Sequence, residues 1–584
     1  MNQMNDIYIL GISCFYHDAA AALIKNGVVI AAAQEERFTR KKHDDRFPEE
    51  AINYCLKHAG ISVKDITAIA YYEKPFVKFE RLLSTYIKTW PRGFLSFLKA
   101  MKVWLKEKLW IPNVIKKNLK YEGPVYYIEH HLSHAASSFF ASPFEKSAIL
   151  TIDGVGEWAT STWGTGNANK IDLKNEIRFP HSLGLLYSAF TYYLGFKVNS
   201  GEYKVMGLAP YGEAKYTDQI WKLLDVKPDG SFALNMKYFA YEYGLRMTNK
   251  NFHKLFGAPP RKPESKVTQR EFDLAKSLQV VLEEIMLKIV DHIYNQTKEE
   301  NLCLAGGVAL NCVANGRILR ESKFKNIYIQ PASGDAGGAL GAALYVYNAI
   351  LGEKRVYSMD HAYLGPEFTD SEIEDVLTTY EIPYKKYEEN ELMEKVADDI
   401  DKQKVAGWFQ GRMEYGPRAL GNRSILADAR NKENWQRVNL KIKFRESFRP
   451  FAPTVIEEDL NKYFDLNVPT PFMLLVAQVK KTDIPAVTHV DNSARIQSVS
   501  KNQNPKYHKL ISKFKEKTGT SVIINTSFNV RGEPIVCTPL DALKCFMRTD
   551  MDVLVLGGYV VTNENIDKDA VRKKHKWNQK FESD

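Results

Sequence analysis

Residues 127–140 read YIEHHLSHAASSFF, which places His130 and His134 four residues apart. In an α-helix, residues at positions i and i+4 lie on the same face about one turn apart, so the two imidazoles can converge on a single metal ion. The segment lacks the Glu that a zincin helix carries between its histidines, which disfavours a metalloprotease. On this stretch alone, a hydrogen-bonded and half-buried histidine pair explains the pattern as well as a metal site does.

Residues 7–36 precede this segment. They are predicted to form a strand, a loop and a second apolar stretch that contains a turn. The first strand, IYILGIS, runs into the loop CFYHD, and the next apolar stretch contains Asn26-Gly27, which is typical of a hairpin turn. Sugar kinases and actin-like ATPases begin in a similar way, with the first loop near a phosphate. Here the loop contains His17 and Asp18. Either residue could position or deprotonate a hydroxyl, although a His beside an Asp is more often a structural pair.

Two carboxylates are further candidate ligands for the metal ion. Asp153 follows the apolar stretch SAILTI at a glycine-rich turn, and Asp335 lies between the strand NIYIQP and small residues that open a helix. Together with the two histidines, they form a mixed N/O donor set that suits Fe(II), Mn(II) or Zn(II). Glycines after strands also let the backbone approach a phosphate, and the candidates here are Gly306, Gly307 and Gly337.

Composition bounds the remaining choices. With 584 residues, 45% of them hydrophobic, the chain exceeds what one core usually organises, so at least two domains are expected. The six cysteines show no CxxC pairing, and the N-terminus lacks a basic region followed by an apolar run. These features predict a cytoplasmic protein with reduced thiols. No apolar stretch approaches the roughly 20 residues needed to span a bilayer.

The net charge of +10 is concentrated in one segment. Residues 81–120 contain ten Lys or Arg against a single acid, so the rest of the chain is close to neutral, which disfavours a nucleic-acid footprint over the whole protein. Three interpretations of this segment are open: an amphipathic helix capping the core, a lid over an anionic or extended acceptor, and a membrane-surface patch. Its apolar residues near helical spacing are Phe94, Phe97, Leu98, Met101, Trp104, Leu105 and Leu109.

A second α/β unit is predicted after a change of composition at residues 353–371. Cations in two short stretches of this unit are interrupted by glycines and prolines, so they do not follow a helical surface stripe. We expect them to converge on phosphate oxygens, which bidentate guanidinium groups bind well. The predicted phosphate-binding side chains are Arg412, Arg418, Arg423, Lys441, Lys443, Arg445 and Arg449, with Asn525 and Ser527 on a later strand end.

Taken in order, these motifs resemble the NodU/TobZ-type O-carbamoyltransferases over almost the full chain. The shared motifs are HxxxH, the turn at Asp153, GEYKVMGLAPYG, GGVALN, SGDAGGALGAA, GRMEYGPRALGNRSIL, FRPFAP, and NTSFN with GEPIV. The resemblance implies an α/β protein in two parts. Residues 1–352 would form an ASKHA-type domain (actin-like ATPase/sugar kinase-like, duplicated RNase H-like) for metal-dependent carbamoyl transfer. Residues 353–371 would be a linker, and residues 372–584 a YrdC-like domain that forms carbamoyl adenylate.

The resemblance also implies the reaction of an ATP-dependent O-carbamoyltransferase, a transferase of one-carbon groups. Carbamoyl phosphate and ATP, with Mg(II), would form carbamoyl adenylate and pyrophosphate in the C-terminal domain. An acceptor hydroxyl would then receive the carbamoyl group beside Fe(II) in the N-terminal domain and release AMP. Mn(II) and Zn(II) are alternatives to Fe(II). The implied metal ligands are His130, His134, Asp153 and Asp335.

The resemblance assigns further roles. Catalytic roles are implied for His17, Asp18, Arg418 and Lys443. Adenylate binding is implied for Gly306, Gly307 and Asn311, and acceptor binding for His17, Glu202, Tyr203 and Lys204, the last three expected in a glycine-bounded loop.

We expect small-molecule partners, with a hydroxylated sugar or natural product as acceptor, no nucleic acid, and a homo-oligomer as an open option. A rival is a tRNA threonylcarbamoyladenosine-type modification enzyme, which the near-neutral charge outside one segment disfavours.

Overall fold

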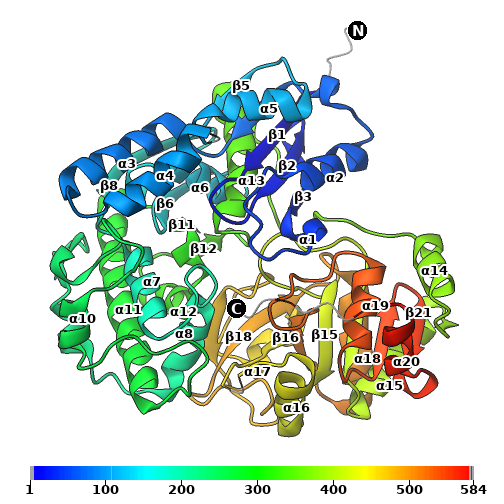
Figure 1. The fold of residues 1–584 in the computed structure, drawn as a ribbon. Helices are drawn as coiled ribbons and strands as arrows, with labels where there is room; N and C mark the ends of the chain where they lie inside the picture. Colours follow the sequence, from blue (N-terminus) through cyan, green and yellow to red (C-terminus); the bar gives the residue numbers. More distant parts are fainter. Residues whose placement is uncertain (1–5, 107, 447, 578–580, 582–584) are drawn as a thin grey trace. The chain divides into compact units, whose positions relative to one another are not determined.

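The computed structural model describes residues 6–106, 108–446, 448–577 and 581 (Figure 1). These residues divide into two compact units. The first unit comprises the residues up to Glu35 together with His43–Met359, and the second comprises Glu36–Lys42 together with the residues from Asp360 onward. The sequence did not indicate that Glu36–Lys42 would group with the second unit. The separate functions assigned to the two predicted domains stay a prediction.

The first unit begins with a five-stranded sheet of order β3-β2-β1-β4-β5. The first three strands are antiparallel, and β4 and β5 continue the sheet parallel to β1. Asn26 and Gly27, both at positive φ, form the predicted turn between β2 and β3. The five strands are β1 (Tyr8–Ser13), β2 (Ala20–Lys25), β3 (Val28–Gln34), β4 (Ala68–Tyr71) and β5 (Val125–Tyr127).

A second five-stranded sheet in the same unit repeats this plan, with the order β12-β11-β6-β7-β8. Its first three strands are again antiparallel, and its last two again run parallel to its first. This repeated strand order confirms the prediction of a duplicated α/β fold. The strands are β6 (Lys146–Ile152), β7 (Ala159–Asn167), β8 (Lys170–Arg178), β11 (Asn301–Ala305) and β12 (Asn326–Ile329).

Two helices link the halves of the first unit. Helix α6 (His130–Phe139) follows the first sheet in the chain but packs on β6, β7 and β11 of the second sheet. Helix α13 (Asp335–Tyr345) follows the second sheet but packs on β1, β2 and β4 of the first. The two helices also pack on each other, and a side chain at Gly341 would collide with the carbonyl of Ser133. This close approach sets the spacing between His130 and Asp335.

The basic segment forms helices at the edge of the first unit. Figure 1 shows α3 (Pro75–Thr89) beside α4 (Phe94–Lys106), with α5 (Ile111–Leu119) after them. The predicted apolar stripe does not pack as a whole, because α4 contacts the core through only one side. Trp104 and Leu109 are buried, whereas Phe94, Leu98 and Leu105 are exposed. The core-capping interpretation therefore accounts for part of the stripe only.

Further helices of the first unit cover the second sheet or border the site. The long helix α11 begins with a capping box between Thr268 and Glu271. The helices used below are α2 (Glu49–Ala59), α7 (Leu183–Tyr193), α8 (Glu202–Leu208), α11 (Gln269–Thr297) and α12 (Cys312–Glu321). None of the helices in the described part of the chain is long and apolar enough to cross a membrane.

The second unit is built on one nine-stranded mixed sheet of order β13-β21-β20-β14-β15-β19-β16-β18-β17. Trp408, Leu426 and Phe514 belong to its core, where α15 (Glu389–Asp401) and α18 (Pro505–Thr518) pack together. The fold is therefore mixed α/β in both units, as predicted. The strands are β13 (Lys385–Lys386), β14 (Ala406–Phe409), β15 (Arg423–Asp428), β16 (Ala452–Ile456), β17 (Leu475–Gln478), β18 (Ser493–Val499), β19 (Val522–Ser527), β20 (Val553–Leu556) and β21 (Tyr559–Thr562).

Candidate functional site

Four predicted metal ligands meet in the interior of the first unit. His130 and His134 lie one turn apart on α6, Asp153 follows β6, and Asp335 is the first residue of α13. All four side chains are buried, and one potential ligand atom from each lies within 4.8 Å of the others. Nε2 of His130 is 3.0 Å from Oδ2 of Asp153 and 3.7 Å from Oδ1 of Asp335. The structure thus brings together residues that are up to 205 positions apart in the chain.

The charges and hydrogen bonds of this group fit a cation. Neither carboxylate oxygen of Asp335 has a hydrogen-bond partner among the described residues, although both atoms are buried. Burial by itself would lower the pKa of His130, but the hydrogen bond that its Nε2 donates to Asp153 and the charge of Asp335 outweigh it and raise that pKa to about 9. Buried carboxylate oxygens without partners are costly unless something positive compensates them. The N/O donor set therefore suits a divalent transition metal ion.

Neighbouring groups hold the donors in place. Glu157 accepts hydrogen bonds from the backbone N–H of His130 at 3.0 and 3.1 Å, which fixes the start of α6. Gly307 donates its N–H to Oδ1 of Asp153 at 3.1 Å, leaving Oδ2 toward the histidines. His131 points away from the donor group, and its Nδ1 lies 2.6 Å from the hydroxyl of Thr151. These contacts orient the donor group before any ion is bound.

The predicted loop residues His17 and Asp18 form a hydrogen-bonded cluster with a third residue, His43. The Asp18 carboxylate lies 3.0 Å from Nδ1 of His17 and 2.7 Å from Nδ1 of His43. Burial would lower the pKa of His17, but the charges of Asp335 and Asp18 raise it to about 10. The influence of Asp335 shows that this cluster adjoins the donor group. His43 was not predicted, since no local sequence pattern connects it to Asp18, 25 positions earlier.

The predicted acceptor residues do not lie in a loop. Glu202, Tyr203 and Lys204 form the first turn of α8, so that expectation was wrong. The glycines around this segment permit close packing rather than an open loop: a side chain at Gly201 would collide with Phe196. Oε1 of Glu202 accepts a hydrogen bond from Ser188 at 2.8 Å. Binding of an acceptor by these residues stays a prediction.

The residues predicted to bind adenylate have structural contacts of their own. Gly306 has φ of 91° and packs so closely on Ile152 that a side chain would collide with its carbonyl. Asn311 accepts from the N–H of Ala314, capping α12, and exchanges hydrogen bonds of 3.0 Å with Gln279 on α11. At Gly337, a side chain would collide with a neighbouring carbonyl. These contacts explain the residue types without any nucleotide.

Some of the predicted cations converge in the second unit. Lys443 is buried, and its ammonium group donates to the carbonyls of Ser527 and Asn529 at 2.7 and 2.9 Å and to the Ser527 hydroxyl at 3.1 Å. Burial and the charges of Arg445 and Arg449 hold the pKa of Lys443 well below its usual range. Burial and the charge of Arg449 likewise lower the pKa of Arg445. Mutually repelling cations in a buried place favour an anionic ligand.

Other predicted phosphate ligands have different environments. Arg423 is fully buried, lies with its guanidinium 3.7 Å from the ring centre of Phe409, and donates to backbone carbonyls that include Gln410 at 2.6 Å and Pro366 at 2.9 Å. Arg412 donates to the carbonyl of Leu364 at 2.6 Å. Lys441 is exposed, and Arg418 is half-buried. The structure thus ties Arg423 into the protein and does not add it to the Lys443 cluster.

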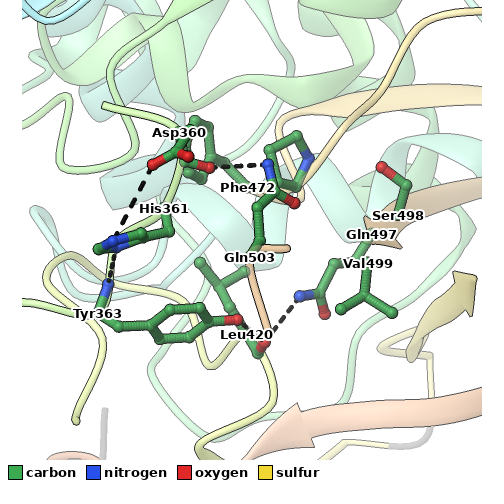
Figure 2. A pocket seen from close by; sticks show the side chains of 11 residues that line it. Asp360, His361, Tyr363, Leu420, Phe472, Gln497, Ser498, Val499 and Gln503 are labelled. Carbon is green, nitrogen blue, oxygen red and sulfur yellow. Dashed lines mark hydrogen bonds and ion pairs between the residues drawn. The ribbon is translucent and has the colours of Figure 1, made fainter. Parts of the chain in front are cut away.

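A small pocket in the second unit was not predicted. Figure 2 shows Tyr363 and Gln497 converging on the carbonyl of Leu420, to which each donates at 2.8 Å. His361 stacks on Tyr363 with ring centres 5.6 Å apart. The oxygen of Gln497 accepts a hydrogen bond of 2.8 Å from the predicted site residue Asn525. The sequence signals near this pocket are the composition change that predicted a linker and the motif GRMEYGPRALGNRSIL, which contains Leu420.

Comparisons with known proteins extend these observations. Residues 8–344 match the model of the carbamoyltransferase N-terminus, and residues 397–563 match that of the carbamoyltransferase C-terminus. An uncharacterized protein of Synechocystis is 55% identical and covers 99% of this chain and 100% of its own. Nodulation protein NolNO of Sinorhizobium fredii is 39% identical over 94% of this chain and 79% of its own length. A 3'-hydroxymethylcephem-O-carbamoyltransferase of Streptomyces clavuligerus is 34% identical over 44% of this chain and 47% of its own.

Proposed function

This chain belongs to the carbamoyltransferase family, and from that premise we propose that it is an ATP-dependent O-carbamoyltransferase using carbamoyl phosphate. The observation that carries the proposal is the presence of two chemically different sites in one chain. The first unit has a buried N/O donor group whose Asp335 oxygens lack partners among the described residues. The second has Lys443 and Arg445, whose pKa values are lowered by burial and by neighbouring cations that include Arg449. The cations of the second unit suit the formation of an acyl nucleotide from two anions, and the donor group of the first unit suits transfer of its acyl group.

The first step is assigned to the second unit. Carbamoyl phosphate, ATP and water would give carbamoyl adenylate, phosphate and pyrophosphate. Two polyanions must approach each other in this step, so their repulsion has to be screened. Lys443, Arg445 and Arg449 would supply that screening, and Arg418 would contact the reacting phosphates. The hydrogen bonds from Lys443 to Ser527 and Asn529 support this role, because they hold its ammonium group in a fixed place without neutralising it.

The second step is assigned to the first unit. The acceptor oxygen would form a bond with the carbamoyl carbon, the bond from that carbon to the AMP oxygen would break, and the hydroxyl proton would go to a base. His17 is the candidate base, held through Nδ1 by Asp18 so that Nε2 is its proton-accepting atom. A bound metal ion would offset the charge of Asp335, the largest of the charges that raise the pKa of His17 and keep its imidazole protonated without the ion. His43 would keep Asp18 oriented. Enclosure of the site would protect the intermediate from water.

His130, His134, Asp153 and Asp335 would hold the metal ion, with Fe(II) preferred and Mn(II) or Zn(II) as alternatives. The chemistry that such an ion supplies is Lewis-acid stabilisation of negative charge on the oxygens around the reacting carbon. The residues themselves contribute the orientation: Glu157 fixes the start of α6, and Gly307 turns Oδ2 of Asp153 toward the histidines.

The acceptor is proposed to be a hydroxyl group on a sugar or a natural product. The cephem relative is named for transfer to a hydroxymethyl group, which supports an oxygen rather than a nitrogen acceptor. Glu202, Tyr203 and Lys204 are the candidate acceptor contacts in α8.

Pyrophosphate release tests the proposal directly. The protein would be mixed with ATP and carbamoyl phosphate in one reaction, and with ATP, threonine and bicarbonate in another. We expect release in the first mixture only. Release that depends on threonine would instead support a tRNA threonylcarbamoyladenosine-type enzyme, and tight nucleotide binding without release in either mixture would contradict both.

A further inference from the structure

A face of the α3 and α4 helices in the first unit combines exposed apolar side chains with exposed cations. We name it the α3–α4 face. At the end of α3 and in the turn that follows, Ile87 is 78% exposed and Trp90 is 68% exposed. On α4, Leu95 is 73% exposed. The other exposed apolar members of this face are Phe94, Leu98 and Leu105. An apolar surface of this kind on a soluble unit marks an interaction site.

Helical geometry makes these side chains contiguous. The rings of Trp90 and Phe94 are in edge contact, with centres 5.8 Å apart. Phe94, Leu98 and Leu105 follow one another at spacings of four and seven residues, so they lie along one side of α4. An adjacent side of α4, about a quarter-turn away, faces the core, where Trp104 packs on Phe79 at 5.8 Å between ring centres. The outward side therefore carries a continuous apolar stripe that the core does not use.

Cations flank this stripe. Lys99, Lys102 and Lys106 are all exposed, and their positions in the helical repeat lie next to Leu95 and Leu98. Arg92 in the preceding turn is also exposed. Helix α4 contains no acidic residue in its sequence, and Glu80 is the single acid of α3. The face is therefore both apolar and strongly positive.

We propose that the α3–α4 face binds in the plane of an anionic lipid bilayer. Helices that lie in a membrane interface have Trp, Phe and Leu on one side with Lys and Arg beside them, and both features occur here. Lysines of this kind gain attraction from anionic lipids. A second copy of this chain is a poorer partner, because apposed copies of the same face would bring like charges together.

The α3–α4 face is tied directly to the loop that carries His17. The ammonium group of Lys108, just after α4, donates to the carbonyl of Phe15. Lys78 on α3 forms an ion pair with Glu73 and lies over the ring of Tyr16, 4.6 Å from its centre. Docking of the face would hold this loop of the first unit beside the membrane. The proposal concerns binding alone and does not depend on the carbamoyl transfer proposed above.

Vesicle co-sedimentation of the full chain tests the proposal. The protein would be mixed with vesicles of phosphatidylcholine alone or of phosphatidylcholine with phosphatidylglycerol, at low and high salt. We expect binding to the anionic vesicles only, and release by salt. The triple variant Lys99→Glu, Lys102→Glu, Lys106→Glu should bind at least about a hundredfold more weakly, since each lysine near such a surface contributes roughly a fivefold factor to the binding constant and three such factors multiply. Leu95→Ser should weaken binding by about tenfold, because a leucine side chain is withdrawn from the interface.

Matched controls come from exposed residues elsewhere in the first unit. Lys146→Glu, Lys170→Glu, Lys174→Glu makes the same charge change on β6 and β8, and Leu351→Ser removes an exposed leucine that follows α13. Both controls should bind like the wild type. Three outcomes would overturn the proposal: no binding of the wild type to anionic vesicles, an equal loss in the control variants, or a concentration-dependent dimer that Leu95→Ser dissociates. The circular dichroism spectrum of each variant confirms that the fold is retained.

Discussion

Nε2 of His134 lies 3.1 Å from Nε2 of His130 in the interior of the first unit. Two imidazole nitrogens at this distance cannot both point a proton at each other, so at least one of them presents a lone pair. The carboxylates of Asp153 and Asp335 face the same two atoms at 3.0 to 4.0 Å. Lone pairs and negative charge therefore converge on one small volume, and a metal cation would satisfy all of them together.

Replacing His130 with Ala should separate the two proposed reactions. The variant loses one of four ligands. Mutation of a residue that only hydrogen-bonds to a metal ligand typically lowers metal affinity by about tenfold to a hundredfold, so we expect the loss here to be at least that large. Acceptor carbamoylation should be lost with the metal. Pyrophosphate release should persist, because the Lys443 cluster lies in the other unit. The control is His131→Asn, which alters the neighbouring histidine outside the donor group and should keep its metal. Loss of both reactions in His130→Ala would contradict the division of labour.

Metal removal provides an independent check. Chelation should abolish carbamoyl transfer and leave pyrophosphate release unaffected, provided that Mg(II) is supplied with ATP. Adding metals back one at a time should place Fe(II) at or near the top of the ranking. Elemental analysis of the same samples measures the metal content. Full transfer activity in metal-free protein would remove the metal from the mechanism.

Replacing Arg418 with Ala should abolish adenylate formation. A guanidinium that contacts reacting phosphates contributes through charge stabilisation, and loss of one such group typically slows a reaction by about a hundredfold to a thousandfold. The measurement is pyrophosphate release from ATP and carbamoyl phosphate. Lys432→Ala, an exposed cation of α16 (Lys432–Arg437) in the same unit, should leave the rate unchanged. An unchanged rate in Arg418→Ala would exclude that residue from the phosphate site.

Arg423→Lys should act on stability rather than on substrate binding. The lysine keeps the charge but cannot reproduce several hydrogen bonds to carbonyls or the stacking on Phe409, so about 3 kcal/mol of stability should be lost. Thermal unfolding should shift down while the KM for carbamoyl phosphate stays the same. A raised KM without a change in stability would return Arg423 to the phosphate-binding residues.

The buried carboxyl of Glu35 should make stability depend on pH. Burial raises its pKa to about 6 from an ordinary value of 4.5, although the N–H groups of Ala51 and Glu50 at the start of α2 counteract part of the effect. Between pH 4.5 and pH 6 the folded chain then binds more protons than the unfolded chain. The free energy of unfolding therefore falls as the pH rises through this range. The expected loss is about 2 kcal/mol. Glu35→Gln cannot ionise and should lack this component when urea unfolding is compared at pH 4.5 and pH 7. Equal pH dependence in both proteins would contradict the assignment.

Much of the local architecture could be predicted from the sequence because its signals act over short distances. Asn26-Gly27 forms a turn since both residues tolerate positive φ, and the apolar strand segments alternate with helices as their patterns indicate. The i and i+4 spacing of His130 and His134 is likewise a property of one helix. The long helix α11 follows its own periodicity and its capping box at Thr268.

Other features required the packed chain. The α4 stripe has helical spacing whether it faces the core or solvent, and the structure leaves Phe94, Leu98 and Leu105 exposed. Glu202 and its neighbours are polar residues between glycines, a pattern that suits a loop, yet packing on Ser188 and Phe196 places them in a helix. A sequence pattern records residue type and spacing, but not which face finds a partner.

The sequence by itself determined the family resemblance, the two α/β parts and the types of donor available for metal and phosphate. Only the tertiary structure decided which of them meet. Helices α6 and α13 each pack on the other half's sheet, and this exchange brings His130 within reach of Asp335. Tertiary packing also brings His43 to Asp18 in the first unit. Within the second unit, separate packing buries Arg423 among carbonyls and places Lys443 near Arg445. Spacing along the chain governs contacts within a turn or a strand, whereas convergence of distant residues depends on the close packing of whole elements.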